Sequence, residues 1–519
     1  HEEQVGRILA DRLPGTPVAL SSRLLRRHME YERANTTVAS VYCSSRLGRY
    51  LNELSDGLHA RQIRAPLSVM SSAGGFLSGA SARDAPVQLV ESGPSAGATY
   101  VAELARRLDR ADVLAFDMGG TTAKACLIRE GRLPMTTEVE AARAESYRIG
   151  SGIPLQVTAV NLIEVGAGGG SIATIDSVGL VRVGPRSAGA RPGPACYLRG
   201  GTSATVTDAD LVLGHLAPHS FLGGQMRLGV AEAQAALTAL ASDVADAVEM
   251  ARVVQEVVTE NMSAAVLRHV IERGGDPERL TLVAFGGAGP VHAYALAKRL
   301  GIKEFLVPPL AGVLSAVGLL TAQPTFRSSR TVKLDLRDVD VGRLATPVSE
   351  LRDEIGAALR TVDAVAAPEF SVYADCAYAG QSSVLSVPVT DPDTADGDSI
   401  AADFAAAYQS TYGYSQADVR VEVVTVTAEG RLPVAQPELP RDARGAVRPD
   451  GTRRAWSHVR GRFEDFAVRW RTSLRPGERV DGPVIIEETE STTVVDVDGS
   501  ALLDDVGNLR IEVPTGVPS

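Results

Sequence analysis

The amino-acid sequence predicts an α/β protein that ends in a β-rich C-terminal domain. Residues 113–128 consist of an apolar run, a glycine turn and a second apolar run, as in two strands joined by a tight turn. Residues 280–302 also begin with an apolar run and a glycine turn but continue as a helix. From about residue 371, apolar and polar residues alternate with period two, as in 371–389 and 421–434. This order favours mixed strand and helix layers followed by strands.

Length and composition limit the class of protein. A chain of 519 residues predicts two to four domains, and 45% hydrophobic with 22% charged residues is ordinary for a globular protein. The net charge of −11 disfavours a nucleic-acid partner, because phosphate contacts need clustered Lys and Arg. No apolar run approaches the ~18 residues of a membrane span, and no signal peptide is visible.

The cysteines and the first residues add two expectations. The four cysteines are far apart and form no CxxC pair, which argues against a zinc site or a disulfide framework and favours a reducing cytoplasm. The chain starts at His1 inside a segment that already has a helical pattern. We therefore expect the natural protein to begin earlier, or a preceding segment to be absent from this chain.

Helices are predicted for most of residues 1–64, where apolar residues recur at helical spacing. A strand is expected at Pro66–Met70 and a second, short one at Val87–Val90. The small residues of Glu91–Gly97 then form a turn that opens a helix. Backbone N–H groups at such a helix start favour an anion, and close packing of the helix on a sheet explains the same small residues.

Glycine-rich segments fill the middle of the chain. The apolar stretch Val157–Val165 leads to Gly168–Gly170, which either curve around a ligand or form a simple turn. Residues 178–216 are rich in Gly, Pro and Ala and are expected to form a long ordered loop, a kind of loop that is usually functional. Asp208 in this loop is either a helix N-cap or a contact to metal or substrate.

The second half begins with helices over 230–274, followed by the strand, glycine turn and helix of 280–302. Pro290 suits the first turn of that helix. His292 falls in the same turn, where packing or capping is a more common role than catalysis. The remaining expectations are a strand, turn and helix at 304–322, a strand and helix within 333–370, a helix at Ser399–Tyr412, a Pro/Arg/Asp-rich linker at 438–455 and short strands over 456–513.

Asp117–Thr122 contain the groups that a phosphate site needs. The adjacent glycines Gly119 and Gly120 let backbone N–H groups approach an anion, and the two threonine hydroxyls add donors. The Asp117 carboxylate at the strand end can hold a hydrated magnesium ion. Taken alone, an ordinary β-hairpin turn explains the same residues about equally well.

The order of these motifs resembles that of the family of N-methylhydantoinase A subunits, ATP-dependent 5-oxoprolinases and acetone carboxylase β subunits. The similar stretches cover almost the whole chain in the expected order. They are part of EYERANTT (31–37), SAGG (72–75), ESGPSAG (91–97), FDMGGTTAK (116–124), GAGGGSIA (166–173), VGPRSAGARPGPACY (183–197), TVTDADLVLG (205–214), AFGGAGPVHA (284–293), GVLSAVGLL (312–320) and GPVIIEETESTTVV (482–495).

The resemblance implies the fold of acetate and sugar kinases, heat-shock ATPases and actin, with two ribonuclease-H-like halves around an ATP cleft. Family members usually begin with an earlier DxGGT hairpin, and no such motif precedes residue 117 here. The hairpin at Asp117–Thr122 is then the second phosphate grip. Residues 1–108 are expected as the C-terminal part of an incomplete first half, 109–330 as the second half and 331–519 as the β-rich domain.

The resemblance also implies a site for ATP and Mg²⁺, with Mn²⁺ as the alternative ion. Asp117 is expected as the metal ligand and a catalytic residue, and Asp208 as a second catalytic residue. The phosphates are expected on Gly119, Gly120, Thr121 and Thr122, the adenosine beside Gly286, Gly287 and Gly289, and further wall contacts at Gly168, Gly169 and Gly170.

The implied reaction is ATP-dependent ring opening of a lactam or imide, in which phosphorylation of the carbonyl oxygen lets water open the ring. One alternative is a subunit of an ATP-dependent ketone carboxylase of the acetone or acetophenone type. Another is a non-catalytic nucleotide-binding scaffold. The expected partner is a B-type hydantoinase or carboxylase subunit in a homo- or hetero-oligomer, with no role for nucleic acid or membrane.

Overall fold

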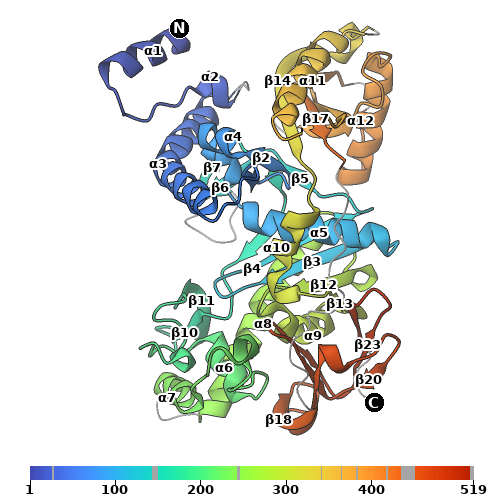
Figure 1. Ribbon diagram of the computed structural model, residues 1–519. Helices are drawn as coiled ribbons and strands as arrows, with labels where there is room; N and C mark the ends of the chain where they lie inside the picture. The colour runs from blue at the N-terminus through green and yellow to red at the C-terminus, as the bar shows by residue number, and fades with distance from the viewer. Residues whose placement is uncertain are drawn as a thin grey trace. The chain divides into compact units, whose positions relative to one another are not determined.

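The chain folds into two units, each assembled from three separate stretches (Figure 1). Unit 1 contains His1–Ser95, Met135–Val160 and Thr321–Gln436. Unit 2 contains Ala96–Pro134, Asn161–Leu320 and Pro437–Ser519. This computed structural model describes residues 1–25, 29–142, 150–241, 246–340, 342–363, 365–381, 384–416, 419–433 and 450–514.

A mixed sheet of eight strands runs through unit 2, in the order β20-β23-β24-β13-β12-β3-β4-β9. Strand β12 is parallel to both of its neighbours, β3 and β13. The apolar side chains of β3 and β12 are buried. The central strands are β3 (Asp112–Met118), β4 (Ala123–Arg129), β9 (Ile163–Val165), β12 (Thr281–Phe285) and β13 (Glu304–Val307).

The last strands of the chain extend this same sheet. Strand β24 pairs antiparallel with β13, and β23 and β20 follow at the edge. The stretch expected as one β-rich C-terminal domain is therefore divided between the two units. The C-terminal strands of unit 2 are β18 (Gly451–Ser457), β19 (Arg462–Trp470), β20 (Arg479–Asp481), β21 (Val484–Glu487), β22 (Thr492–Val495), β23 (Ser500–Leu503) and β24 (Leu509–Glu512).

Close packing explains the small residues at the start of helix α5 (Ser92–Arg107). A Cβ added to Gly97 would lie 2.4 Å from the ring of Phe285, and one added to Gly318 would lie 2.1 Å from the carbonyl oxygen of Ala96. The other helices and strands of unit 2 are β10 (Ser171–Ile175), β11 (Val181–Ser187), α6 (Val206–Val212), α7 (Val230–Ala241), α8 (Ala247–Ile271), α9 (Gly289–Leu300) and α10 (Leu314–Thr321), with short 3-10 turns at η2 (Ala195–Tyr197), η3 (Phe221–Gly224), η4 (Pro277–Arg279), η5 (Ala311–Val313) and η7 (Arg471–Ser473).

The long ordered loop expected at 178–216 is partly regular, since it contains β11, η2 and α6. Helix α6 begins at Val206 because Thr205 caps it, and its side chain accepts a hydrogen bond from the backbone N–H of Asp208. Asp208 is thus the third residue of the helix rather than its N-cap.

The first part of unit 1 is helical, as its apolar spacing predicts. The strand expected at Val87–Val90 is wrong: Pro86 opens a 3-10 turn there, because its ring fixes a helical φ. Val87 is buried against Leu155 and Val157, so this apolar side chain is removed from water without a strand. The elements are α1 (Glu2–Arg12), α2 (Ser21–Leu24), α3 (Glu30–Ala60), β1 (Ser68–Met70), β2 (Phe76–Ser78), α4 (Gly79–Asp84), η1 (Pro86–Leu89), β5 (Met135–Thr136), β6 (Val139–Ala141), β7 (Ile153–Leu155) and β8 (Ala159–Val160).

A four-stranded antiparallel sheet, β14-β17-β15-β16, forms the second part of unit 1. Helices α11 and α12 pack on it around a core that includes Ile355, Phe404 and Val426. Most of the linker expected at 438–455 lies outside the described residues. The elements are β14 (Thr325–Asp335), η6 (Leu336–Asp338), α11 (Ala345–Arg360), β15 (Glu369–Tyr378), β16 (Leu385–Pro388), α12 (Gly397–Tyr412) and β17 (Val421–Arg431).

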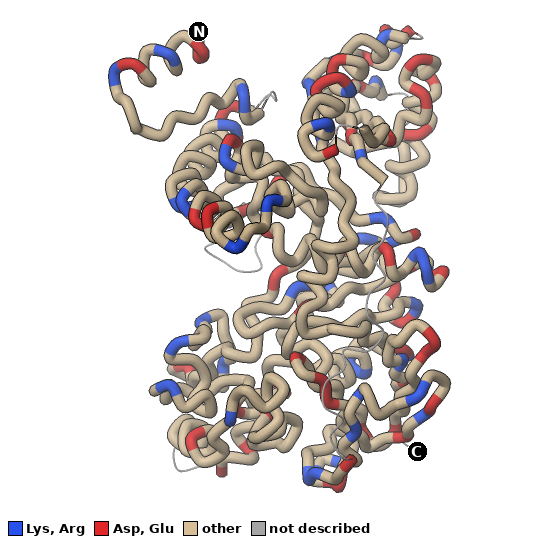
Figure 2. Tube along the Cα trace, viewed as in Figure 1, with Lys and Arg blue, Asp and Glu red and all other residues tan. Residues whose placement is uncertain are grey.

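Charged side chains of both signs are interspersed along the trace of each unit in Figure 2. Among the residues that the structure describes, no helix combines the length and the apolar character that crossing a membrane requires.

Candidate functional site: a glycine-lined cavity in unit 2

The β3–β4 hairpin presents Gly119 and Gly120 to open space. Met118 pairs with Ala123, and the turn between them is closed by a 3.1 Å hydrogen bond from the N–H of Gly119 to the carbonyl of Thr122. A Cβ added to either glycine would meet no atom within 4 Å. Packing against the protein therefore does not require glycine at these two positions, and the free space in front of the backbone suits an anion.

Gly168–Gly170 dock on this turn through their backbone. The N–H groups of Gly169 and Gly170 donate to the carbonyls of Gly119 and Gly120, at 3.0 and 2.6 Å. A Cβ on Gly168 would lie 2.5 Å from the backbone of Thr121, and one on Gly170 would lie 2.9 Å from the carbonyl oxygen of Gly120. The glycines at 168 and 170 thus permit close approach of two loops, whereas Gly169 lines a cavity.

The glycine segment after β12 joins the same turn from the other side. Gly286 has a φ of +82°, and a Cβ there would lie 2.4 Å from both Asp117 Oδ1 and the carbonyl oxygen of Met118. The N–H of Ala288 donates to that carbonyl at 2.9 Å. The two glycine motifs, far apart in the sequence, therefore meet at the ends of adjacent parallel strands. Gly287 lines the cavity, and Gly289 begins helix α9 against Met118.

Asp117 is the last but one residue of β3, opposite Lys124 of β4. Burial raises the pKa of its carboxyl group, and the positive charge of Lys124 opposes that shift. Its side chain contacts the Gly286 backbone rather than the cavity wall. Thr122 is half-buried and Thr121 is exposed at the turn, and neither lines the cavity.

The carboxylate of Asp208 is occupied by hydrogen bonds within the protein. It accepts hydrogen bonds from the N–H and hydroxyl of Thr205, at 2.9 and 2.7 Å, and from the N–H groups of Cys196 and Ala195, at 2.8 and 3.3 Å. It is fully buried and ties the turn of η2 to helix α6. Since these four donors occupy its oxygens and it does not line the cavity, the structure gives it no visible access to a substrate.

The cavity beside these glycines encloses about 800 Å³, including the part open to solvent. Glycine backbone forms one part of its wall, and apolar side chains from η2, η3 and α9 form another. Tyr197 and Phe221 are close neighbours in this wall, with ring centroids 5.9 Å apart. The lining residues are Gly119, Gly120, Gly169, Tyr197, Thr207, Asp210, Leu216, Ala217, Ser220, Phe221, Leu222, Gly287, Ala288, Val291 and Glu487, Glu488, Thr489, Glu490, Ser491 and Thr492.

Asp210 is a lining residue that the sequence analysis missed. It is almost fully buried, and its Oδ1 accepts a 2.8 Å hydrogen bond from the amide of Gln255. His292 Nε2 lies 3.2 Å from Asp210 Oδ2, without the alignment of a hydrogen bond. The same amide of Gln255 lies 3.0 Å from Nδ1 of His215. His292 is thus fully buried and faces Asp210, which agrees with a packing or positioning role.

The turn between β21 and β22, Glu487–Thr492, is the second missed part. It carries three glutamates into the cavity wall. Glu487 pairs with Arg453 and accepts a 3.0 Å hydrogen bond from Ser220. Glu488 pairs with Arg471 at 2.9 Å.

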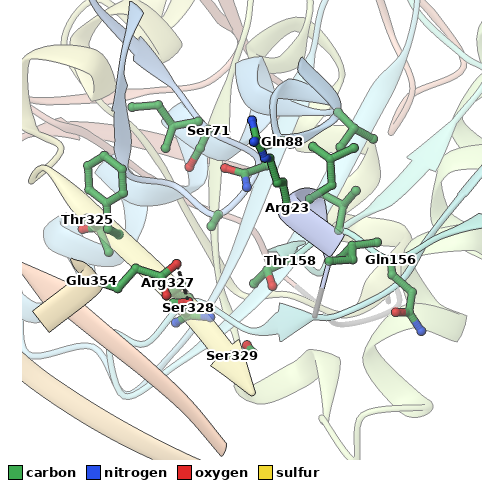
Figure 3. A pocket seen from close by; sticks show the side chains of 17 residues that line it. Arg23, Ser71, Gln88, Gln156, Thr158, Thr325, Arg327, Ser328, Ser329 and Glu354 are labelled. Carbon is green, nitrogen blue, oxygen red and sulfur yellow. Dashed lines mark hydrogen bonds between the residues drawn. The ribbon is translucent and has the colours of Figure 1, made fainter. Parts of the chain in front are cut away.

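Unit 1 contains a separate cavity, shown in Figure 3. Its wall combines hydroxyl, amide and charged side chains, and within this wall Ser328 donates a 3.2 Å hydrogen bond to Glu354. None of the site residues expected from the sequence lines this cavity. The labelled side chains are Arg23, Ser71, Gln88, Gln156, Thr158, Thr325, Arg327, Ser328, Ser329 and Glu354.

Comparison with known proteins adds family relationships to this geometry. Residues 33–328 match the family described as hydantoinase/oxoprolinase, and residues 346–511 match the hydantoinase/oxoprolinase C-terminal domain. An uncharacterized protein of Methanocaldococcus jannaschii is 34% identical, over 99% of this chain and 75% of that protein. The caprolactamase subunit alpha of Pseudomonas jessenii is 31% identical, over 95% and 72%. The acetophenone carboxylase gamma subunit of Aromatoleum aromaticum is 29% identical, over 95% and 69%.

Two solved structures share the fold. The crystal structure of the ATP-dependent caprolactamase from Pseudomonas jessenii superposes with a TM-score of 0.81 at 29% identity, covering 99% of this chain and 74% of that one. The nucleotide-free structure of acetone carboxylase gives a TM-score of 0.79 at 24% identity, with the same coverage. The second similarity concerns the fold alone.

Proposed function

Because the chain belongs to the hydantoinase/oxoprolinase family, we propose that it is an ATP-dependent ring-opening amidohydrolase subunit that phosphorylates a lactam or imide carbonyl. The observation that carries this proposal is the junction of the two glycine motifs beside a cavity that both motifs line. One relative is named as a subunit of caprolactamase, and a solved relative is described as an ATP-dependent caprolactamase. These names support a cyclic amide as the substrate class and ATP as the second substrate.

In this proposal the backbone N–H groups that follow Gly119 in the turn bind the phosphates of ATP, since the N–H of Gly119 itself donates to Thr122. The space in front of both glycines is the observation that fits an anion there. Asp117 would supply one carboxylate for Mg²⁺, which would neutralise charge on the phosphates; its side chain contacts Gly286 beside the cavity and would have to turn toward the wall to reach the ion. Magnesium ions that act on nucleotides commonly use one or two carboxylates together with phosphate oxygens and water.

The protein's contribution is mainly positioning, since phosphoryl transfer needs aligned reactants and charge stabilisation rather than covalent catalysis. The carbonyl oxygen of the lactam bonds to the γ-phosphorus as the bond to ADP breaks. A first water then adds to the activated carbon, and the ring nitrogen leaves as an amine with a proton from that water, which opens the ring and gives an acyl phosphate. A second water hydrolyses the acyl phosphate to the free carboxylate and inorganic phosphate. We expect the phosphate grip at Gly119 and Gly120 to hold the γ-phosphate in line for the first step.

A ketone carboxylase subunit is the second candidate. It is favoured by the similarity to a subunit of acetophenone carboxylase. Both candidates use the same nucleotide site and differ in the molecule that receives the phosphoryl group. Several relatives are named as subunits, so we also propose a B-type partner subunit for this chain.

Gly120→Val tests the phosphate grip. The added side chain meets no protein atom near its Cβ, so we expect the fold to be retained, while the anion space is filled. Calorimetric titration with Mg-ATP should show binding to the wild type and a loss of at least about tenfold in the variant. Gly451→Val is the matched control, because that glycine of β18 also has open space around it. Equal ATP affinity in all three proteins, or no heat with the wild type, would refute the site.

The reaction is tested by phosphate release with a panel of lactams, hydantoins and ketones, with and without a co-purified partner. Stimulation by cyclic amides supports the amidohydrolase. Stimulation only by ketones with bicarbonate replaces it with the carboxylase.

A further inference from the structure

The turn Glu487–Thr492 is held rigidly beside the glycine segment of the cavity. The N–H of Glu488 donates to the carbonyl of Ser491 at 2.9 Å, which closes the turn. A Cβ on Gly312 would lie 2.5 Å from Cβ of Glu490, and one on Gly287 would lie 3.7 Å from the carbonyl oxygen of Glu490. Glu490 is therefore fixed next to Gly287, in direct contact with the backbone around it.

The three glutamates of this turn differ in their partners. Arg453 neutralises Glu487, and Arg471 neutralises Glu488. No Lys or Arg side chain among the described residues forms an ion pair with Glu490. Burial, followed by the charge of Glu488, raises the pKa of the Glu490 carboxyl group. A half-buried carboxylate without a cation is costly unless hydrogen-bond donors reach it.

The backbone N–H of Glu490 itself is one hydrogen-bond donor to this carboxylate, and further donors can come from a ligand. A carboxylate only accepts hydrogen bonds and repels phosphate, so the matching ligand group is a neutral donor such as a hydroxyl. Glu490 lines the same cavity as Gly119 and Gly120, and it lies beside Gly287. It is thus close to the phosphate end without being part of the phosphate grip.

The neighbouring residue of the turn indicates what lies on the other side. A Cβ on Gly223 of η3 would lie 2.8 Å from the side chain of Thr489, so Thr489 contacts the element that also supplies Phe221 and Leu222 to the apolar wall. The turn thus spans from the glycine segment to the apolar wall. In a nucleotide, the sugar likewise connects the phosphates to the base.

We propose that Glu490 accepts hydrogen bonds from the 2′- and 3′-hydroxyls of the ribose, and so makes this cavity selective for ribonucleotides. The inference rests on the proposed nucleotide site and adds a specificity residue to it. The same chemistry, an acidic side chain on ribose hydroxyls, occurs in the unrelated dinucleotide-binding fold.

The test compares ATP, 2′-deoxy-ATP and 3′-deoxy-ATP in calorimetric titrations of the full-length protein. Wild type should bind ATP about tenfold more tightly than either deoxynucleotide, since a hydrogen bond to a charged group is worth about that factor. Glu490→Ala keeps the Cβ contact with Gly312 but removes the acceptor. It should weaken ATP binding about a hundredfold, because two hydrogen bonds are lost, and weaken each deoxynucleotide, which keeps one of the two hydroxyls, about tenfold. The ratio of ATP affinity to deoxynucleotide affinity should then be close to one.

Two further variants complete the design. Glu490→Gln keeps the shape and an acceptor but removes the charge. Its ratio of ATP affinity to deoxynucleotide affinity should therefore fall between the ratios of wild type and Glu490→Ala. Glu256→Gln, an exposed glutamate of α8, should leave the ratio unchanged. Failure of wild type to distinguish the three nucleotides, or retention of the full ratio in Glu490→Ala, would overturn the ribose contact while leaving the nucleotide site standing. Absence of ATP binding to wild type would overturn both.

Discussion

Gly286→Ala is the sharpest test of the junction between the two glycine motifs. At this position the backbone has a φ of +82°, which costs a residue with a side chain about 1–2 kcal/mol. The new Cβ would also lie 2.4 Å from Asp117 Oδ1 and from the carbonyl oxygen of Met118. Overpacking of this kind costs about 1–3 kcal/mol more, because the carbonyl belongs to a buried strand. We expect a loss of about 2–5 kcal/mol in the free energy of unfolding of unit 2.

A control variant separates the two costs. Gly274 has a φ of +65°, and a Cβ there would meet no atom within 4 Å. Gly274→Ala should therefore lose only about 1–2 kcal/mol, from the backbone conformation. The difference between the two variants in the free energy of unfolding measures the cost of the steric overlap with Asp117 and Met118.

The chain offers a convenient probe for this measurement. Its two tryptophans, Trp456 and Trp470, both belong to unit 2. Urea unfolding followed by tryptophan fluorescence reports on this unit, and Mg-ATP titration reports on the displaced hairpin turn. If Gly286→Ala and Gly274→Ala lose the same stability and both bind ATP normally, the two motifs do not touch as described and the reasoning fails.

Two further variants test neighbouring parts of the site. Asp117→Asn should abolish most ATP turnover, while its melting temperature at pH 7 should equal or exceed that of wild type. Burial raises the pKa of Asp117, so the folded state binds this proton more tightly than the unfolded state and stability falls as pH rises through that pKa. The advantage of the Asn variant should therefore shrink as pH is lowered toward the usual carboxyl range, and near-normal turnover would contradict the magnesium assignment. Arg471→Met should cost about 3–5 kcal/mol and weaken ATP binding, because the buried guanidinium bonds Glu488 and the carbonyls of Val307, Pro308 and Gly507. Arg479→Met, which removes exposed ion pairs, should cost less than about 1 kcal/mol, and similar losses in the two variants would show that the Arg471 contacts are not retained in solution.

Local patterns in the sequence were sufficient to predict the β3–β4 hairpin and the strand, turn and helix around Gly286. In both segments, an apolar run that ends in glycine is compatible with few local structures other than a buried strand followed by a turn. Val87–Val90 has an equally apolar pattern but forms a 3-10 turn, since Pro86 presets the backbone and Val87 can still be buried from a turn. Short apolar runs are therefore ambiguous where a proline precedes them.

Asp208 and Asp210 show why the site was harder to predict than the fold. The two residues lie in one short motif, and side chains two positions apart on a helix point in different directions. Once Thr205 caps α6, Asp208 faces the loop of Cys196 and Asp210 faces the cavity. The register of the helix decides which carboxylate is accessible, and that register depends on the cap at Thr205, whereas the sequence left N-cap and ligand contact as the two alternatives for Asp208.

The turn Glu487–Thr492 was recognised as part of a family motif but not as a wall of the site. Its placement depends on Arg453 and Arg471, which pair with Glu487 and Glu488. These are contacts between residues distant in the sequence, and no local periodicity encodes them.

The position of β23 and β24 at the edge of the central sheet has a consequence for the order of folding during synthesis. The strands around Asp117 and Gly286 leave the ribosome long before Leu509–Glu512. Until those last strands arrive, β13 has an unpaired edge and the wall formed by Glu487–Thr492 is missing. A nascent chain therefore holds both glycine motifs but not the completed cavity. We expect nucleotide binding to appear only after Leu509–Glu512 have been translated, and the exposed edge of β13 to need protection from aggregation until then.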